Sequence, residues 1–295
     1  MISSTTEAKE NMESEPLHRH VTFQKLPNSK YNVEGNSDKE GVHIMRRPWL
    51  HPLPEPTTLT LERISLPDGN PDFAGVIRNV LSKEECQHLI KCSEKVGYEQ
   101  ATVTTFGNQQ VTMTNYRKSS RCIIDSDNIA GVIWERISNH IPQPSQISSL
   151  QLSAPPRNGG RNCHRRNIDA SLQRKTPAES SHWRPYEINH RMRFLRYDEG
   201  EYFNRHGDGC YVDDSDESKR RQSWVTFQVY LNDGFEGGGT TFVARGENES
   251  KDVTVVPETG MVLLFSHPIE HQGDLVASGR KYAIRSDIMF ERDGF

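Results

Sequence analysis

A histidine and an aspartate separated by one residue stand out in the sequence, as His206 and Asp208 in the segment YFNRHGD. In an extended segment, side chains two residues apart point to the same side, so this imidazole and this carboxylate would converge on one point. Alone the pair is a weak signal, because it also occurs by chance in exposed loops. It gains meaning when a third ligand can be found elsewhere in the chain.

Two further histidines, His267 and His271, directly follow the apolar run Met261–Phe265. A histidine at the end of a strand, far in sequence from the first pair, is the expected place for a third ligand. Two histidines and one carboxylate on one side of a metal leave three positions open, which is the ligand set of non-haem Fe(II) oxygenases. Zinc accepts the same atoms, so the ligand types alone do not decide the metal.

Lys281 lies ten residues after His271, on a following β-run. A 2-oxo acid held by iron at one end needs a cation at its far carboxylate, and Lys281 or the neighbouring Arg280 could supply that donor from inside a barrel. A single lysine is normally a surface residue, and the spacing from His271 is what makes this one a candidate. Strand alternation turns Arg280 to the opposite face, which favours Lys281.

The elements that must position these side chains are short strands. From Ile188 onward, β-branched or aromatic runs alternate with turn segments such as DEG, NDGFEGGG, PETG and SGR. The runs are 192–197, 225–231, 240–244, 252–256, 261–265 and 281–290. Many short strands without helices between them predict an antiparallel sandwich or barrel, here a jelly roll.

Helices are predicted only before this β-rich part. Ser82 and Glu85 have the spacing of a capping box, and the helix that they open would end at Gly97. A second amphipathic helix is predicted over Asn128–Ile141. A strand and a hairpin are predicted at 73–80 and 101–114. The predicted fold class is therefore α+β and mainly β, with a double-stranded β-helix (jelly-roll) core and flanking N-terminal helices.

The amino-acid composition indicates that parts of the chain do not contribute to a hydrophobic core. Hydrophobic residues make up 33% of the 295 residues, and with glycine the apolar share stays below the roughly 45–50% of typical globular chains. Two polar segments account for the deficit. Residues 1–57 are predicted to be a disordered N-terminal arm, and 143–182 a polar insertion within a single domain over 58–295.

Charge and targeting features exclude several classes of function. The formal net charge of −4 gives no reason to expect a nucleic-acid partner. No apolar run approaches the roughly 18 residues of a membrane span, and the N-terminus lacks the features of a secretory signal. The 5 cysteines form no CxxC pair, so reduced thiols and a cytoplasmic or nuclear location are the simplest interpretation.

Four motifs stand in order in the second half of the chain: RFLRYDEGEYFNRHGDG, VTFQVYLNDGFEGGGTTF, PETGMVLLFSHPIEHQG and GRKYAIRSDIMF. Together they resemble the catalytic domain of the iron(II)/2-oxoglutarate-dependent dioxygenases, of the prolyl 4-hydroxylase alpha-subunit type. The upstream segment FAGVIRNVLSKEECQHLIKCSEKVGYEQA resembles the entry of that domain more weakly. The resemblance covers about residues 70–142 and 183–292, on either side of the insertion.

The resemblance implies roles for individual residues. His206, Asp208 and His271 match the catalytic iron ligands, and Lys281 matches the residue that binds the distal carboxylate of 2-oxoglutarate. His271 is preferred to His267 because it has the glycine and the lysine at the family offsets.

Three more side chains are candidates for binding the cosubstrate. Tyr197 and Tyr230 stand where family members place aromatic or hydroxyl groups beside it. Arg285 shares the face of the lysine if the strand is regular. It could contact the cosubstrate or the substrate, or it could form an ion pair with Asp287 or Glu291.

The implied activity is a hydroxylation that uses Fe(2+), 2-oxoglutarate and O2, releases succinate and CO2, and draws on L-ascorbate to keep the iron reduced. The expected substrate is a prolyl or other side chain of a protein or peptide, with proline resting only on family analogy. Two alternatives stay open: a small-molecule hydroxylase with the same chemistry, and a catalytically silent jelly-roll binding module. No membrane partner is expected.

Overall fold

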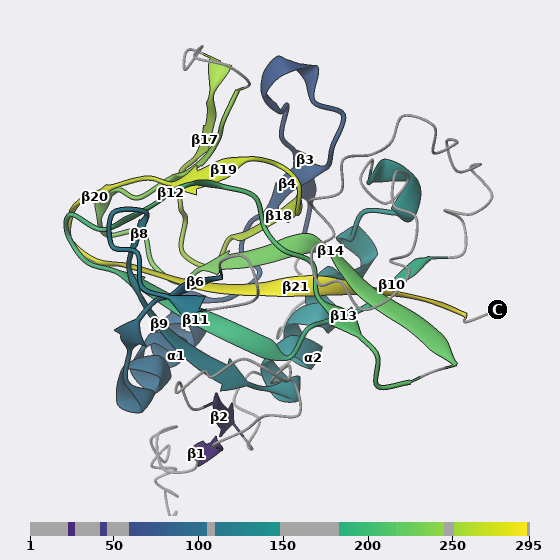
Figure 1. Ribbon diagram of the computed structural model, residues 1–295, viewed down its shortest axis with the longest axis horizontal. Helices are drawn as coiled ribbons and strands as arrows, with labels where there is room; N and C mark the ends of the chain where they lie inside the picture. Colours follow the sequence, from purple (N-terminus) through teal and green to yellow (C-terminus); the bar gives the residue numbers. More distant parts are fainter. Residues whose placement is uncertain are drawn as a thin grey trace, which may run out of the picture.

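The computed structural model describes residues 59–104, 110–147, 183–216, 218–244 and 251–293, and the strands at 23–26 and 42–45. A large sheet, here called the main sheet, runs through the molecule (Figure 1). Its path is β1 (Phe23–Leu26), β2 (Val42–Met45), β9 (Ser120–Asp125), β11 (Arg191–Tyr197), β21 (Lys281–Asp293), β14 (Lys219–Tyr230), β18 (Val262–Ser266), β4 (Ala74–Ile77) and β3 (Leu61–Arg63). Off this path, β10 (Arg184–Ile188) pairs with β21, β13 (Val212–Asp213) with β14, and β5 (Glu99–Gln100) with β9.

A smaller sheet, here called the facing sheet, completes the jelly roll. Its order is β17 (Val253–Val255), β16 (Thr240–Phe242), β19 (His271–Gly273), β12 (Tyr202–His206) and β8 (Arg117–Lys118). Two ribbons pair β15 (Glu236–Gly237) with β20 (Val276–Ser278), and β6 (Val103–Thr104) with β7 (Gln110–Val111). The predicted jelly-roll fold and the hairpin in 101–114 are confirmed.

Apolar side chains from both sheets fill the space between them. Tyr230 and Leu263 of the main sheet share a buried cluster with Phe242 and Val255 of the facing sheet. Strand alternation sends one set of side chains into this space and the other set to the opposite face of the main sheet. The inner set therefore combines core residues with the candidate site.

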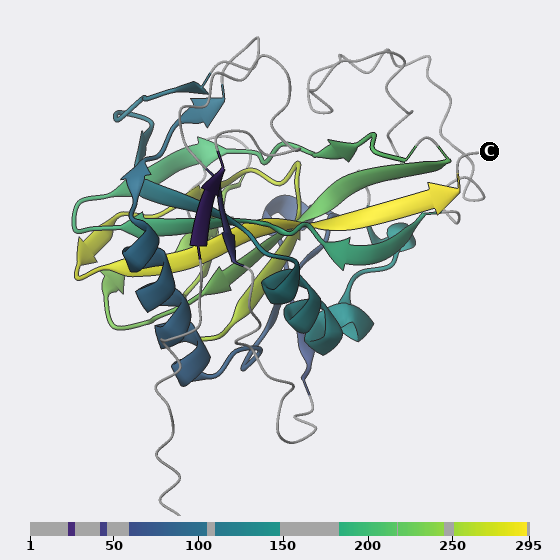
Figure 2. The same cartoon turned by 90° about the horizontal axis from the view of Figure 1, so that it is seen from below.

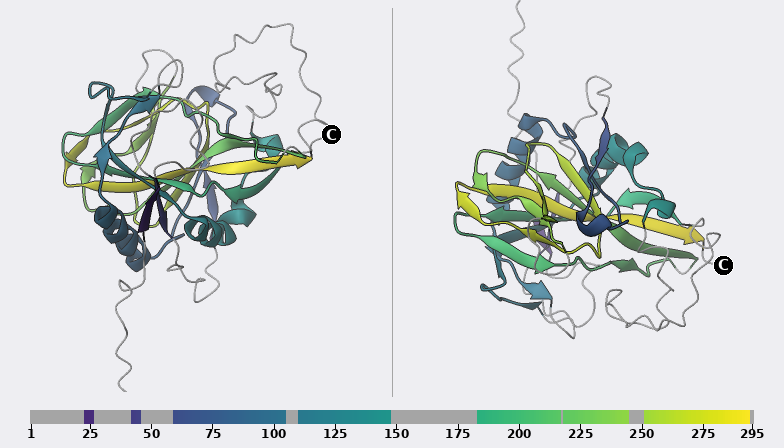
Figure 3. Two further views of the ribbon diagram at one scale, coloured as in Figure 1. Left: turned by 60° about the horizontal axis from the view of Figure 1, so that its bottom comes forward. Right: turned by 90° about the horizontal axis from the view of Figure 1, so that it is seen from above.

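Two helices cover the outer face of the main sheet. Figure 2 shows α1 (Lys83–Val96) and α2 (Asp127–Ile137) in front of the strands of the main sheet. In the two further views of Figure 3, both helices again lie on one side of this sheet. Leu89 of α1 and Ile133 of α2 belong to one core cluster with strand residues of the outer face such as Phe194 of β11. Burial of each such side chain contributes about 1.5–3 kcal/mol.

The helix ends follow the local sequence. Ser82 Oγ accepts from the Glu85 backbone N–H and the Glu85 carboxylate accepts from the Ser82 backbone N–H, so the predicted capping box is present. α2 ends at Ile137, before the expected end at 141, and a 3-10 turn, η3 (Ser138–His140), follows it. Two more such turns are η2 (Pro67–Gly69) and η4 (Pro144–Gln146).

The division into arm, domain and insertion stays a prediction. Most of residues 1–57 and of 143–182 lie outside the described residues. The short strands β1 and β2 fall within the expected arm, and β2 pairs in parallel with β9. The start of the expected insertion is packed, since Ile147 is fully buried in the core with the helices.

The cysteines do not all match the prediction. Cys86, Cys92 and Cys122 are buried and free, and burial raises their thiol pKa values. Cys210 is disulfide-bonded, so the expectation of reduced thiols throughout is wrong. Spacing alone could not reveal this bond, because connectivity depends on the fold.

Within the described residues, no helix has the length and apolarity to cross a membrane.

Candidate metal centre

The facing sheet brings the three predicted ligands together. His206 ends β12 and His271 begins β19, and the antiparallel pairing of these strands places the two residues opposite each other. Their ring centroids are 4.3 Å apart. Asp208 follows β12 at once, with carboxylate oxygens 4.0 Å from His206 Nε2 and 3.8 Å from His271 Nε2. The three ligand atoms all lie within 4.8 Å of one another.

Both imidazoles are fixed in the tautomer that a metal ligand needs. Nδ1 of His206 lies 2.7 Å from the Asn204 carbonyl, and Nδ1 of His271 lies 2.9 Å from the Ile269 carbonyl. A carbonyl only accepts, so each Nδ1 carries the proton and each Nε2 presents a lone pair. Burial lowers the pKa of His206 to about 3 and also lowers that of His271, which keeps both rings neutral. Neutral rings oriented by backbone carbonyls are typical of metal sites.

Asp208 is buried and ionised. Burial by itself would raise the pKa of this carboxyl, but the Arg285 guanidinium and the surrounding histidines hold it below its usual range. Arg285 Nη2 lies 3.0 Å from Asp208 Oδ1. The site therefore offers two neutral imidazole nitrogens and one carboxylate, which are the donors that Fe(II) accepts in such sites.

His267 is not part of this ligand set, and it holds Asp208 in place. Thr226 Oγ1 donates to Asp208 Oδ2 at 2.5 Å and lies 2.9 Å from His267 Nδ1. Because the hydroxyl proton points to the carboxylate, His267 Nδ1 must donate to the hydroxyl. The Asp208 backbone N–H also donates to the His267 carbonyl. Sequence reasoning missed Thr226, although strand alternation from Tyr230 places it on the inner face.

Lys281 lies in a second polar position of the same interior, with Tyr197 and Tyr230. It is 4% exposed, and its Nζ lies 5.3 Å and 5.4 Å from the centroids of the two tyrosine rings. Nζ donates to the Gly238 carbonyl at 2.6 Å, and Tyr230 Oη donates to Thr240 Oγ1 at 2.8 Å. The structure thus places the rings of the two predicted tyrosines beside the buried ammonium group of Lys281.

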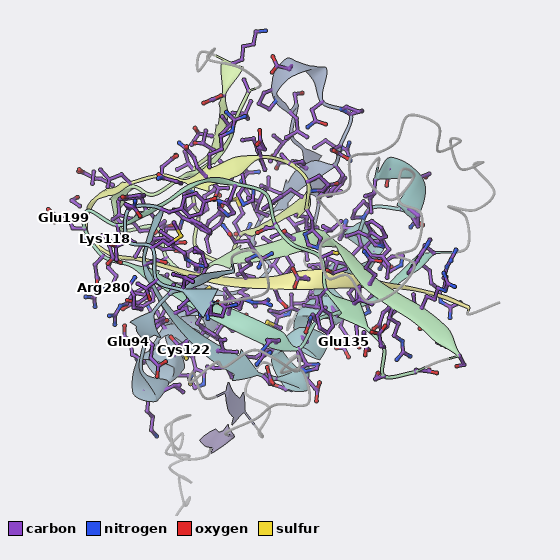
Figure 4. The ribbon with its side chains drawn as sticks, in the orientation of Figure 1. Glu94, Lys118, Cys122, Glu135, Glu199 and Arg280 are labelled. Carbon is purple, nitrogen blue, oxygen red and sulfur yellow. The ribbon has the colours of Figure 1, made fainter. Side chains whose placement is uncertain are left out.

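Arg280 points elsewhere, as strand alternation predicts. Figure 4 places it at the outer edge of the ribbon, and its side chain pairs with Asp198. It is 48% exposed, so it is not a candidate for the interior.

Arg285 faces the interior with Lys281. Of the two alternative ion pairs considered, the one with Asp287 is present, at 3.4 Å, beside the pair with Asp208. Glu291 instead pairs with Arg184, Lys219 and Arg221. Lys219 and Arg221 belong to β14, which begins at Lys219, before the expected strand run at 225–231.

A family model matches the part of the chain that carries this donor set. Residues 192–286 match the model of the 2OG-Fe(II) oxygenase superfamily. That range includes all three ligand candidates, Lys281 and Arg285. The search of the curated proteins gives no match.

Solved structures with a related arrangement include prolyl hydroxylases. The viral collagen prolyl hydroxylase of Paramecium Bursaria Chlorella virus-1 is 18% identical, with 73% of this chain and 95% of that chain covered and a TM-score of 0.40. A Pseudomonas putida prolyl-4-hydroxylase is 15% identical, with 73% and 91% covered and a TM-score of 0.40. A Trichoplax adhaerens prolyl hydroxylase in complex with a hypoxia inducible factor peptide fragment is 17% identical, with 75% and 83% covered and a TM-score of 0.41. At these scores the likeness carries no argument about substrate.

Proposed function

We propose that this chain, in which residues 192–286 match the model of the 2OG-Fe(II) oxygenase superfamily, hydroxylates a C–H bond of a protein or peptide side chain, with proline as the leading candidate. Iron(II) is the cofactor of the family, and 2-oxoglutarate and O2 are its cosubstrates. Succinate and CO2 would be the co-products, and L-ascorbate would keep the iron reduced. The observation that carries the proposal is the convergence of His206, Asp208 and His271 within 4.8 Å.

Different residues of the site would bind the metal and the cosubstrate. His206, Asp208 and His271 would hold the metal, whose chemistry is the activation of O2 with the 2-oxo acid. Lys281 would bind the distal carboxylate of 2-oxoglutarate by a charge-assisted hydrogen bond, with the Tyr197 ring packed against it. Tyr230 is hydrogen-bonded to Thr240 and would shape the same position. Burial excludes water from these contacts and so strengthens them.

Succinate release in the absence of added substrate tests this chemistry. Purified protein supplied with Fe(II), ascorbate and 2-oxoglutarate should release succinate by uncoupled turnover. His206→Ala should abolish it, because two ligands do not hold the metal. His140→Ala, at the end of η3 and outside the site, is the matched control and should retain the activity. If the wild-type protein releases no more succinate than His206→Ala and binds no iron, it is a silent binding module.

Substrate class needs a separate screen. Prolyl peptides and small metabolites would be added in turn, and the stimulation of 2-oxoglutarate consumption and the mass of the product would be measured. A gain of 16 Da on a prolyl peptide supports the leading candidate. The same gain only on a small molecule would replace it with the small-molecule alternative. A cytoplasmic or nuclear location remains a prediction from the sequence.

A further inference from the structure

Arginines crowd the inner face of the jelly roll beside the metal centre. In the main sheet, Arg193 of β11 is paired directly with Arg285 of β21. Arg121 of β9 is opposite Leu195 of β11. Leu195 is two residues from Arg193, so Arg121 and Arg193 are on the same face of the sheet. In the facing sheet, Arg117 of β8 is opposite Phe203 of β12. Strand pairing thus sets four cationic side chains toward one region.

Arg117 is the least compensated of these cations. It is 9% exposed, and its guanidinium donates only to neutral oxygens, at Ser119 Oγ (3.0 Å) and the Thr102 carbonyl (3.4 Å). Within the described part of the chain, no carboxylate lies at ion-pair distance from it. Its side chain stacks over the Phe203 ring at 4.6 Å, and that ring stacks on His206 at 3.6 Å. A buried charge without a partner is costly, so a bound anion is the expected complement.

The other arginines are only partly neutralised. Arg193 and Arg285 share the single carboxylate of Asp287, at 3.5 Å and 3.4 Å. Arg285 also reaches Asp208, which is committed to the metal in the proposed function. Burial and neighbouring arginines lower the pKa of Arg117, and burial lowers that of Arg193 to about 10, although Asp287 opposes the latter shift. Among the described residues, Arg117, Arg193 and Arg285 therefore face only two carboxylates, those of Asp208 and Asp287.

This cationic region is separate from the position of Lys281. Arg285 is four residues from Lys281 on β21, which is roughly 13 Å along a strand. A cosubstrate carboxylate held by Lys281 would therefore leave the positive charge around Arg193 and Arg117 in place. A divalent metal at Asp208 would add two positive charges, of which the second carboxylate of 2-oxoglutarate would offset only one.

We propose that the substrate carries a carboxylate close to the C–H bond that is hydroxylated, and that Arg117 and Arg193 bind it beside the metal centre. The inference rests on the proposed function and narrows its substrate class to acidic peptides or small acids. Arg121 lies on the same face and donates to Thr102 Oγ1 at 2.9 Å, with Glu99 of β5 opposite it in the sheet.

Binding of matched probes tests the proposal on protein loaded with Mn(II) in place of iron and saturated with 2-oxoglutarate. The first pair is a single-proline peptide flanked by glutamates and the same peptide flanked by alanines. The second pair is butyrate and butyramide, which separates a small acid from a peptide as the source of the carboxylate. Dissociation constants would be measured by calorimetry at low and at high salt.

At least one acidic probe should bind about tenfold or more tightly than its neutral partner, and salt should reduce the difference. Arg117→Gln and Arg193→Gln should each remove most of this preference. Arg78→Gln should keep it, because Arg78 pairs with Glu62 and Glu258 away from the site. Equal binding of acidic and neutral probes by the wild type, or a preference that survives both variants, would overturn the proposal.

A second measurement separates a binding arginine from a structural one. Because Arg117 is buried without an anion, Arg117→Gln should leave the melting temperature of the ligand-free protein unchanged or raise it. Failure of this inference is distinct from failure of the proposed function. Succinate release without an acidic preference would retain the enzyme and remove the inference. An acidic preference without succinate release would remove the proposed function and leave an anion-binding site.

Discussion

Lys281 has a buried ammonium group, and in the proposed function it binds 2-oxoglutarate and not the metal. Its contribution can therefore be measured separately from that of the metal ligands. Lys281→Ala should raise the concentration of 2-oxoglutarate needed for half-maximal succinate release by at least tenfold, because the distal carboxylate loses a buried charge partner. The affinity for Mn(II), measured without cosubstrate, should change little. Equal losses in both quantities would show that the lysine serves the fold.

The same burial predicts a pH dependence for cosubstrate binding. Burial lowers the pKa of Lys281 to about 8, so the charged form predominates below that pH and is lost as the pH rises through it. The dissociation constant of 2-oxoglutarate should therefore rise above pH 8. Lys281→Arg keeps its charge to a higher pH and is expected to give a flatter profile, as titrations from pH 7 to 9.5 can check.

Thr226 is the residue through which His267 acts on Asp208. Thr226→Val removes the hydroxyl that donates to Asp208 and accepts from His267, so Mn(II) affinity should fall about 10–100-fold. Thr241→Val is the matched control, because Thr241 is also buried and donates to a carboxylate, that of Asp274, away from the metal. A loss of affinity in both variants, or in neither, would contradict the role given to Thr226.

Residue types at fixed spacing revealed part of this site and not the rest. His206 and Asp208 are two residues apart, at and just after the end of β12, and the offset between His271 and Lys281 is visible in the sequence. Thr226 and Arg117 carry no such local signal, because their roles depend on contacts between strands far apart in the chain.

At the scale of elements, the turn before β18 depends on Gly260. This residue has φ +80°, and a Cβ there would lie 2.0 Å from the Leu81 carbonyl oxygen. Gly260→Ala should lower the free energy of unfolding by about 3 kcal/mol, since neither the backbone conformation nor the contact can be relieved cheaply. Gly131→Ala, in α2 with no atom within 4 Å of the added Cβ, should instead stabilise by about 0.5–1 kcal/mol. Denaturant titration of both variants measures the difference.

Periodicity predicted most elements but not their full lengths. The capping box fixed the start of α1 at Ser82, because that signal is local. β14 begins at Lys219, earlier than its apolar run, since Lys219 and Arg221 pair with Glu291 on β21. A polar strand end that is stabilised by ion pairs across a sheet has the composition of a loop, so the sequence could not distinguish the two.

At the scale of the whole molecule, the metal should act as a stabilising ligand. A metal that binds only the folded protein adds about 2.7 kcal/mol at a hundredfold excess over its Kd. For a domain of this size the melting temperature should rise by roughly 5–10 °C with Mn(II). A chelator should reverse the rise, and His206→Ala should abolish it. An equal rise in that variant would place the metal elsewhere.

The jelly roll itself could be predicted because it repeats one simple signal, the short strand bounded by turn residues. The disulfide at Cys210 and the pairing of β2 with β9 could not, because both depend on which distant segments meet.

The long strand β21 also constrains how the gene can vary. Lys281 and Arg285 face the interior because an even number of residues separates them, and β11 and β14 fix the register of the strand on both sides. Loss of one codon between those two positions would turn one of the two side chains outward. Substitutions at the outward-facing position 282 would leave that alternation intact. In-frame length changes should therefore be far rarer than substitutions in this stretch of any functional allele.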